Sequence, residues 1–317
     1  MPYSISSRPS LSSRLGVANV PGDINPSCDD LIRGPLSAEA VAALRTHPLL
    51  PNAVCAAAGA TAAIARKPPV IINDLGRFLI GNLALYLHYS RDPAVPSSGL
   101  SANRLIALCV EQKVCSKGRA LAAMGLMRNA GHLVPATCQV DHRLRLLVPT
   151  EKLINAGREY WVAIFRGIAV VIPGRSDAIE ALRCEHILAA FLRVFGDYYC
   201  AGVRMLKPGG GLTPLAQHHA AFAILLSLLA DSERDGSATV HISMAELARR
   251  FGVSRPQVAR VLDEAAEAGF VERSGADSLT VLPCLRSVSH DFYVTAFLLC
   301  DHYMRVALNQ NRPRLNH

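Results

Sequence analysis

The chain has 317 residues, a length that suits about two packed units of ordinary domain size. Half of the residues are apolar and only 6% are aromatic, so we expect a mainly helical protein with a sizeable core. Lys and Arg number 33 against 25 Asp and Glu, which gives a net charge of +8. This excess favours an anionic partner, of which nucleic acid is the commonest.

Nine cysteines are scattered along the chain without a CxxC pair, so neither a disulfide framework nor a zinc site is supported. We expect mostly buried, reduced thiols, with a redox sensor as the alternative. The longest clean apolar runs, 53–65 and 220–230, are shorter than the roughly 18 residues that a membrane span needs. The N-terminus lacks the apolar segment of a secretory signal, and residues 1–36 are predicted to form a disordered arm.

The first half of the chain then predicts a series of helices and one hairpin. Residues 38–66 predict one or two helices, and an apolar helix over 75–89 follows a Lys-Pro break. Ser116 begins a further helix, whose apolar positions follow helical spacing. Two short strands, 132–138 and 143–148, come next with a tip at 139–142. The apolar positions of the helix after Ser116 are Ala120, Ala123, Met124 and Met127.

The second half predicts the same order of elements. A long apolar segment over 177–206 joins the halves, and the stretch 207–214 is the clearest boundary. An apolar helix over 215–229 follows, and then two helices joined by a tight turn at Gly252. Ser243 with Glu246, and Ser254 with Gln257, have the spacing of capping boxes. Val258, Val261, Leu262 and Ala265 form one apolar stripe, and two strands over 270–274 and 278–282 complete the unit.

The two halves are related by an internal repeat. Residues 114–131 align with 252–269 without a gap at an offset of 138, which places Ser116 on Ser254 and Lys117 on Arg255. Aligning Pro149 with Pro283 makes the first hairpin four residues longer than the second. We therefore predict a mainly α fold with small β wings, in which tandem winged helix-turn-helix units pack through long helices in a pseudo-two-fold arrangement. Residues 37–176 hold the first unit, and residues 177–317 hold the connecting helix and the second.

The second unit resembles the DNA-binding region of bacterial winged-helix regulators, on the segments LARRFGVSRPQVARVL (247–262) and AGFV (268–271). The flanking long helices make it most similar to the MarR-like family. That resemblance implies a cytoplasmic, nucleoid-associated transcription regulator that binds double-stranded DNA. Family members usually act as homodimers, so two fused halves imply a dimer within one chain. A small-molecule effector and the transcription machinery are further candidate partners, and self-association as a homodimer stays open.

In a helix-turn-helix, the second helix enters the major groove by its N-terminal part, and the wing approaches the backbone or minor groove. The predicted DNA-binding residues of the second unit are Ser254, Arg255, Gln257, Arg260 and, near the wing, Arg273. Those of the first unit are Ser116, Lys117 and Arg119 on the helix, with His142, Arg143 and Arg145 on the wing. The alternative for each Arg is a solvated surface charge.

The two units differ in charge. Residues 101–160 contain nine Lys and Arg against four acids, whereas residues 240–290 contain six of each. We therefore expect the first unit to bind DNA phosphates and the second unit to recognise bases. The first unit also has apolar residues at the exposed helix positions Ala122, Gly125 and Leu126, which can contact a thymine methyl or pack against protein.

Signatures of catalysis are missing from the sequence. There is no GxGxxG, P-loop, HExxH or nucleophile elbow, and we expect no enzyme activity and no cofactor. Two groups of side chains are candidates for metal binding, but we expect structural roles for both. They are His218 with His219, and Asp291 with Asp301 and His302. The alternative function is a protein-interaction scaffold that uses its winged helices without reading DNA.

Overall fold

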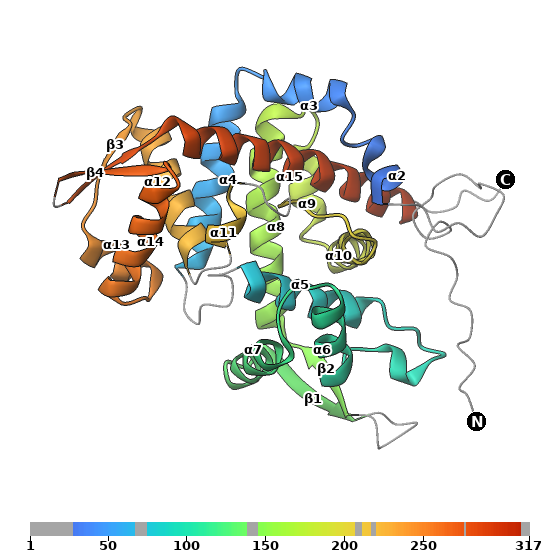
Figure 1. The fold of residues 1–317 in the computed structure, drawn as a ribbon. Coiled ribbons are helices and arrows are strands. Elements are labelled where there is room, and N and C mark those ends of the chain that lie inside the picture. Colours follow the sequence, from blue (N-terminus) through green and yellow to red (C-terminus); the bar gives the residue numbers. More distant parts are fainter. Residues whose placement is uncertain are drawn as a thin grey trace.

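The structure, a computed structural model, describes residues 28–66, 75–137, 145–206, 211–216, 220–275 and 277–311. It is mainly helical, with one two-stranded and one three-stranded antiparallel sheet (Figure 1). Each sheet belongs to a small peripheral unit, and the long helices lie between the two units.

The first half of the chain runs from residue 28 to the end of a long helix at residue 171. Its elements are α2 (Cys28–Arg33), α3 (Ala38–Arg45), α4 (Leu50–Ala65), α5 (Leu75–Tyr89), the 3-10 helix η1 (Pro96–Ser98), α6 (Ala102–Glu111), α7 (Lys117–Asn129), β1 (Leu133–Thr137), β2 (Arg145–Pro149) and α8 (Glu151–Val171).

The second half repeats much of this order and ends in the longest helix. Its elements are α9 (Ser176–Ala181), α10 (Glu185–Cys200), α11 (Thr213–Ala216), α12 (Ala221–Asp235), β3 (Thr239–His241), α13 (Met244–Phe251), α14 (Arg255–Glu267), β4 (Val271–Gly275), β5 (Ser278–Val281) and α15 (Pro283–Gln310).

The central feature of the core is α4, an alanine-rich helix that packs on both α8 and α12. Ala53, Ala57, Ala58 and Ala62 are fully buried, and their small side chains let neighbouring helices approach closely. On the α8 side, a Cβ added at Gly167 would lie 2.8 Å from the carbonyl oxygen of Ala53. An isolated helix of this length would be marginal in water, so packing on both faces stabilises it.

The contacts between the halves are reciprocal. Helix α4 packs on α8 of its own half and on α12 of the other, and α10 packs on α15 of its own half and on α5 of the other. Helix α3 likewise contacts α15, while α9 contacts α8. An offset of 138 places α3, α4 and α8 on α9, α10 and α15, so these paired contacts involve helices at equivalent positions along the chain.

Two arginines at an offset of 138 make the same kind of cross-half contact. Arg66, at the end of α4, donates to Ser227 Oγ on α12 at 2.7 Å and lies over the Phe251 ring of α13. Arg204, after α10, donates to Gln112 Oε1 at the end of α6 at 3.0 Å. Each arginine thus joins one half of the chain to the helix-turn-helix segment of the other half.

The hairpins agree with the predicted strands within one or two residues, but their relative lengths do not. Leu133 pairs with Pro149 in the first hairpin, and Val271 pairs with Val281 in the second. The first hairpin therefore spans 17 residues against 11 and is six residues longer, not four. The alignment of Pro149 with Pro283 was wrong, because Pro149 ends a strand whereas Pro283 begins α15.

Three other boundaries differ from the sequence prediction. The predicted arm reached residue 36, but Cys28–Arg33 form α2 and bury Leu31 against the core. The segment over 177–206 is divided between α9 and α10. The helix predicted over 215–229 begins at Ala221 and continues to Asp235, where Gly236 adopts a left-handed conformation and ends it.

Within the described residues, no single helix is long and apolar enough to cross a membrane. One pair of consecutive helical segments, 31–45 and 50–65, meets the length and apolarity criteria together, but the two segments meet at an angle of 107°.

The close approach of α8 to α4 yields a stability prediction. We expect Gly167→Ala to destabilise the fold by about 1–3 kcal/mol, because the new methyl meets the Ala53 carbonyl oxygen and the Phe297 ring. Gly125→Ala is the matched control, since its Cβ would meet nothing within 4 Å, and it should stabilise α7 by about 0.5–1 kcal/mol. Chemical denaturation measures both, and equal unfolding midpoints for the two variants would contradict the tight α4–α8 contact.

Candidate nucleic-acid interface

The second helix of the second unit, α14, presents a polar N-terminus to solvent. Ser254 caps it by accepting from the Gln257 backbone N–H, and its stripe of Val258, Val261, Leu262 and Ala265 is buried as predicted. Arg255 and Arg260 are exposed and Gln257 is half-buried, so both arginine side chains can reach a partner outside the unit.

The wing of this unit is tied back to α14. Arg273 on β4 forms an ion pair with Asp263 at 2.8 Å and donates to the Ala259 carbonyl oxygen. The predicted role of Arg273 was a phosphate contact, but in the structure its guanidinium neutralises an acid on the helix. Both side chains are exposed, so the pair contributes little to stability and its main effect is on local charge.

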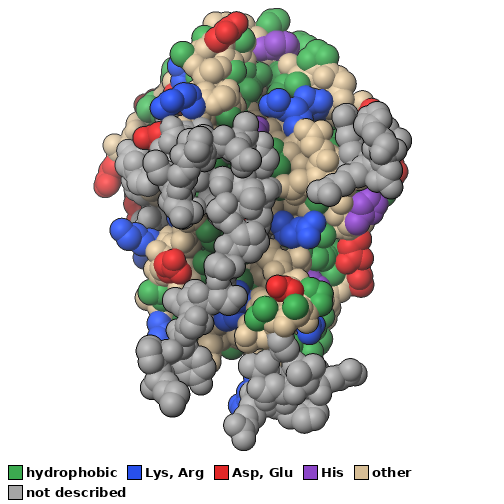
Figure 2. Space-filling model, turned by 90° about the vertical axis from the view of Figure 1, so that its right-hand side faces the viewer, with side chains coloured by type: hydrophobic (Ala, Val, Ile, Leu, Met, Phe, Trp, Pro, Cys, Tyr) green, Lys and Arg blue, Asp and Glu red, His purple; other side chains and the backbone are tan. Residues whose placement is uncertain are grey.

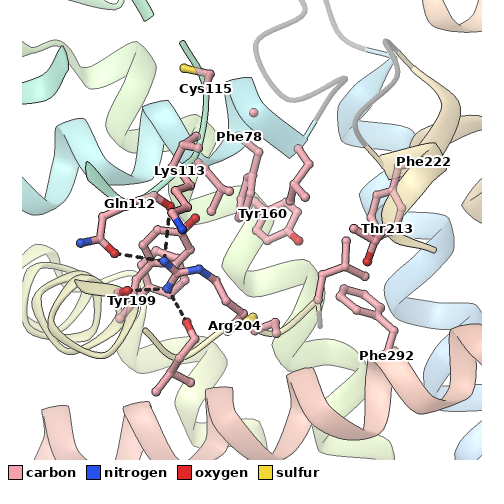
Figure 3. Close-up of a pocket in the computed structure, with 18 of the residues that line it drawn as sticks. Phe78, Gln112, Lys113, Cys115, Tyr160, Tyr199, Arg204, Thr213, Phe222 and Phe292 are labelled. Atoms are coloured by element: carbon pink, nitrogen blue, oxygen red, sulfur yellow. Dashed lines mark hydrogen bonds between the residues drawn. The ribbon is translucent and has the colours of Figure 1, made fainter. Parts of the chain in front are cut away.

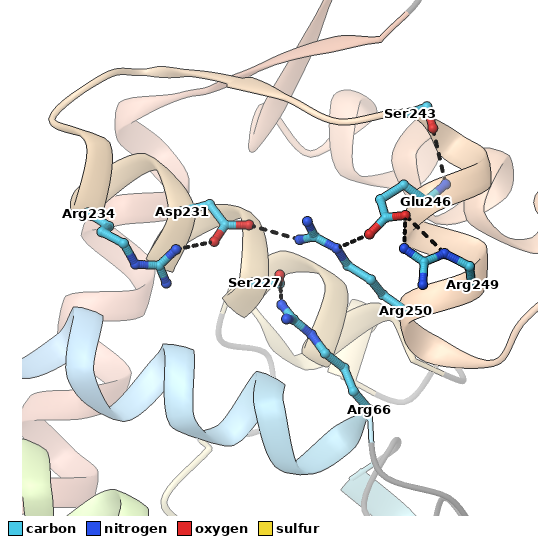
Figure 4. Close-up of polar contacts among 8 residues, drawn as sticks. All are labelled: Arg66, Ser227, Asp231, Arg234, Ser243, Glu246, Arg249 and Arg250. Atoms are coloured by element: carbon cyan, nitrogen blue, oxygen red, sulfur yellow. Dashed lines mark hydrogen bonds and ion pairs between the residues drawn. The ribbon is translucent and has the colours of Figure 1, made fainter.

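A polar network fixes α13 on the core and thereby positions α14 (Figure 4). Asp231 on α12 accepts from Arg250, and Glu246 accepts from both Arg249 and Arg250. These hydrogen bonds lower the pKa of the Glu246 carboxyl. The predicted capping box is therefore only half formed, because Ser243 caps the helix but the Glu246 carboxylate binds arginines.

The first unit has the same local geometry. Ser116 caps α7 by accepting from the Arg119 backbone N–H, and the predicted stripe of Ala120, Ala123, Met124 and Met127 is buried. Lys117, Arg119 and Arg145 are exposed. His142 and Arg143 lie outside the described residues, so the geometry of this wing tip is not placed.

In place of a third strand, the first unit has a single bridge between Ser101 and Leu146. In the second unit, β3 pairs with β5 at the corresponding place ahead of α13.

A cavity of about 700 Å³ lies between the core helices and the first unit (Figure 3). Its walls are mainly apolar, with aromatic and aliphatic side chains, and no acidic residue is among the described residues that line it. Lys113, Arg119 and Arg204 supply positive charge, and Arg204 also stacks on Tyr199 with its guanidinium carbon 3.7 Å from the ring centroid. Burial raises the pKa of Tyr160 and Tyr199, so both phenols are neutral at pH 7. The aromatic lining residues are Phe78, Tyr160, Phe195, Tyr199, Phe222, Phe292 and Tyr303.

On one face of the molecule, the described basic side chains are scattered and do not form a continuous patch. Figure 2 shows Lys and Arg side chains dispersed among apolar, acidic and other groups on that face.

The residues considered for metal binding have structural partners instead. Asp301 is buried and accepts from Arg175 and Arg305, and His302 is hydrogen-bonded to the Tyr198 hydroxyl at 2.7 Å. His218 and His219 lie outside the described residues. Cys109 and Cys300 are buried, whereas Cys184 and Cys284 are exposed, so the expected burial of thiols holds only for some of them.

The comparison with known families matches the second unit. Residues 211–278 match the sequence model of the MarR family. The likeness to this family is confined to the second unit. MarR-family proteins are DNA-binding transcription regulators and often bind small-molecule effectors. No curated protein and no solved structure matches the chain significantly.

Two features of the site were not found from the sequence. The cavity collects residues from positions 61 to 303, and no local motif marks such a set. His132, at the base of the first wing, is 3% exposed and neither ring nitrogen has a hydrogen-bond partner. Alignment of the two units at the offset of 138 could have revealed the burial of His132, because this residue then falls on Phe270, which is equally buried.

Burial of His132 predicts an acid-sensitive first unit. Desolvation, and then the nearby Lys152, lower the pKa of His132 from 6.5 to about 4. The folded chain therefore binds this proton less readily than the unfolded chain, so stability is full above pH 6.5 and falls as the pH decreases towards about 4. The loss should reach up to about 3 kcal/mol, and His132→Phe should remove that component of the pH dependence. Urea unfolding at several pH values measures it, and identical pH slopes for the two proteins would refute it.

Proposed function

We propose that the chain is a sequence-specific regulator of transcription that binds double-stranded DNA with both units at once, as a pseudo-dimer within one polypeptide. The observation that carries this is the MarR-family domain, whose α14 presents Arg255 and Arg260 on an exposed, Ser-capped N-terminus. Arginine can pair bidentately with guanine in the major groove. We expect it to act on the bacterial nucleoid in the cytoplasm, and we propose no catalytic activity for it.

The reciprocal packing supports the pseudo-dimer. In a two-fold interface, a contact from one subunit to the other is repeated in the opposite direction. Here α4 contacts α12 and α10 contacts α5, and Arg66 and Arg204 cross between the halves at the same repeat offset. Because the two units carry different side chains, the best DNA site should be asymmetric rather than a perfect palindrome.

The charge difference between the units should separate affinity from specificity. Lys117→Ala with Arg145→Ala removes two candidate phosphate-binding side chains. The slope of log affinity against log salt should therefore flatten by about 0.9 for each phosphate that is no longer neutralised, on any sequence. Arg255→Ala removes a candidate base-reading side chain and should cost about 1–3 kcal/mol on the preferred duplex and little on a scrambled one. Salt titrations of binding to both duplexes measure these effects.

Arg193→Ala is the matched control, because Arg193 is an exposed arginine of α10 outside both units. It should leave binding to both duplexes unchanged. If Arg255→Ala weakens both duplexes equally, α14 does not read bases; if no variant alters binding in a folded protein, the scaffold function is favoured.

We further propose that the cavity beside the first unit binds a small-molecule effector. Aromatic walls, three cationic side chains and no described acid suit an aromatic or apolar molecule with one anionic group. Arg119 lines the cavity and also lies in the first turn of α7. A bound anion would compete with DNA phosphate for this residue, which couples occupancy to DNA release.

Trp161 provides a direct probe of occupancy. It is the only tryptophan, it is buried, and its ring lies 5.9 Å from that of Phe78 and 5.2 Å from that of Phe195, both of which line the cavity. Anilinonaphthalene sulfonate should change Trp161 fluorescence saturably and weaken DNA binding. Lys113→Gln should raise the Kd of this probe roughly two- to fivefold. The uncharged parent compound is the control, and an equal effect of Lys113→Gln on both compounds would contradict the anion preference.

A further inference from the structure

The outward face of α7 is apolar and smooth, unlike that of a helix that reads bases by hydrogen bonds. Leu121 is 48% exposed and Leu126 is 53% exposed, which is unusual for leucine. At 3.6 residues per turn, these two flank a strip of small residues that is also exposed. The strip consists of Gly118, Ala122 and Gly125.

The corresponding face of α14 is different in one decisive respect. The repeat offset places Gly125 and Leu126 on Asp263 and Glu264. Asp263 is paired with Arg273, but both positions still place carboxylates on a face where α7 has none. Helix α7 contains no acidic residue along its whole length, and its cations, Lys117, Arg119 and Arg128, are exposed at both ends.

The space beside α7 is also open. A Cβ added at Gly118 or Gly125 would meet no other atom within 4 Å. The helix backbone can therefore approach a partner surface more closely there than at any residue with a side chain. At 3.6 residues per turn, Lys117 and Arg128 lie on one side of the strip and Arg119 lies on the other. With no acid on the helix, this arrangement matches a polyanion whose two phosphate strands border the helix on both sides, as in the DNA major groove.

We infer that α7 lies lengthwise in the major groove and reads the C5-methyl groups of thymines with Leu121, Ala122 and Leu126. Thymine is the only unmodified base that presents a methyl group in that groove. The half-site beneath the first unit is thus defined by the spacing of thymines, whereas the half-site beneath α14 is defined by hydrogen-bonding edges. This inference rests on the proposed function, because it requires the first unit to face DNA.

Replacing thymine by deoxyuridine tests this directly, because it removes the methyl and keeps every hydrogen-bonding group. On a duplex obtained by in vitro selection, single replacements should weaken binding roughly fourfold at each thymine that α7 contacts. The variant Leu121→Ala/Leu126→Ala should bind the thymine duplex more weakly and respond less to deoxyuridine at those positions. Arg255→Ala should retain the full response there.

Leu308→Ala is the matched control, since Leu308 is an exposed leucine on α15. It should behave as the unmodified protein on every duplex, and circular dichroism should show that all variants are folded. If the protein binds its selected duplex but no deoxyuridine replacement matters, or if the α7 variant responds like the unmodified protein, the methyl readout is wrong and the regulator function stands. If the protein binds no duplex at all, the proposed function fails and this inference fails with it.

Discussion

The structure depends on the packing of one small-residue helix between the two halves of the chain. Helix α4 lies against α8 on one side and α12 on the other, and each contact allows close approach of backbones. A Cβ added at Gly167 would meet Ala53 and Ala57 on the first side, and one added at Gly59 would lie 3.5 Å from the Ala230 Cβ on the second. A side chain at Gly167 would force α8 away from α4, the helix that also contacts α12 of the other half.

Polar contacts also help to fix the orientation of the two units on this apolar core. Arg66 and Arg204 are too polar to be buried without partners, and each finds them on the helix-turn-helix segment of the opposite half or beside it. Burial lowers the pKa of the Arg66 guanidinium, and its hydrogen bond to Ser227 and contact with Phe251 compensate for some of the missing hydration. Each unit is therefore held by the half of the chain to which it does not belong in sequence.

The two units that this framework holds differ in surface chemistry. The buried stripes of α7 and α14 coincide position by position, and so do their serine caps. Their exposed faces differ, because α14 carries arginines and acids where α7 carries glycine, alanine and leucine. The cavity adds a second difference, since Arg119 at the start of α7 forms one section of its wall. The two units therefore present different chemistry to a partner.

The sequence by itself determined the local elements: the serine caps, the helical stripes, the hairpins and the helix over 75–89, all of which depend on interactions within a few residues. The segments 247–262 and 268–271 also indicated the resemblance to the MarR family, which the match over residues 211–278 supports. Tertiary structure decided what joins residues far apart. The pairing of Arg273 with Asp263, the unpartnered burial of His132 and the cavity between α5, α10 and α15 arise when separate elements pack together. No spacing within a single segment encodes such contacts, because they depend on the relative positions of helices that the local sequence does not specify.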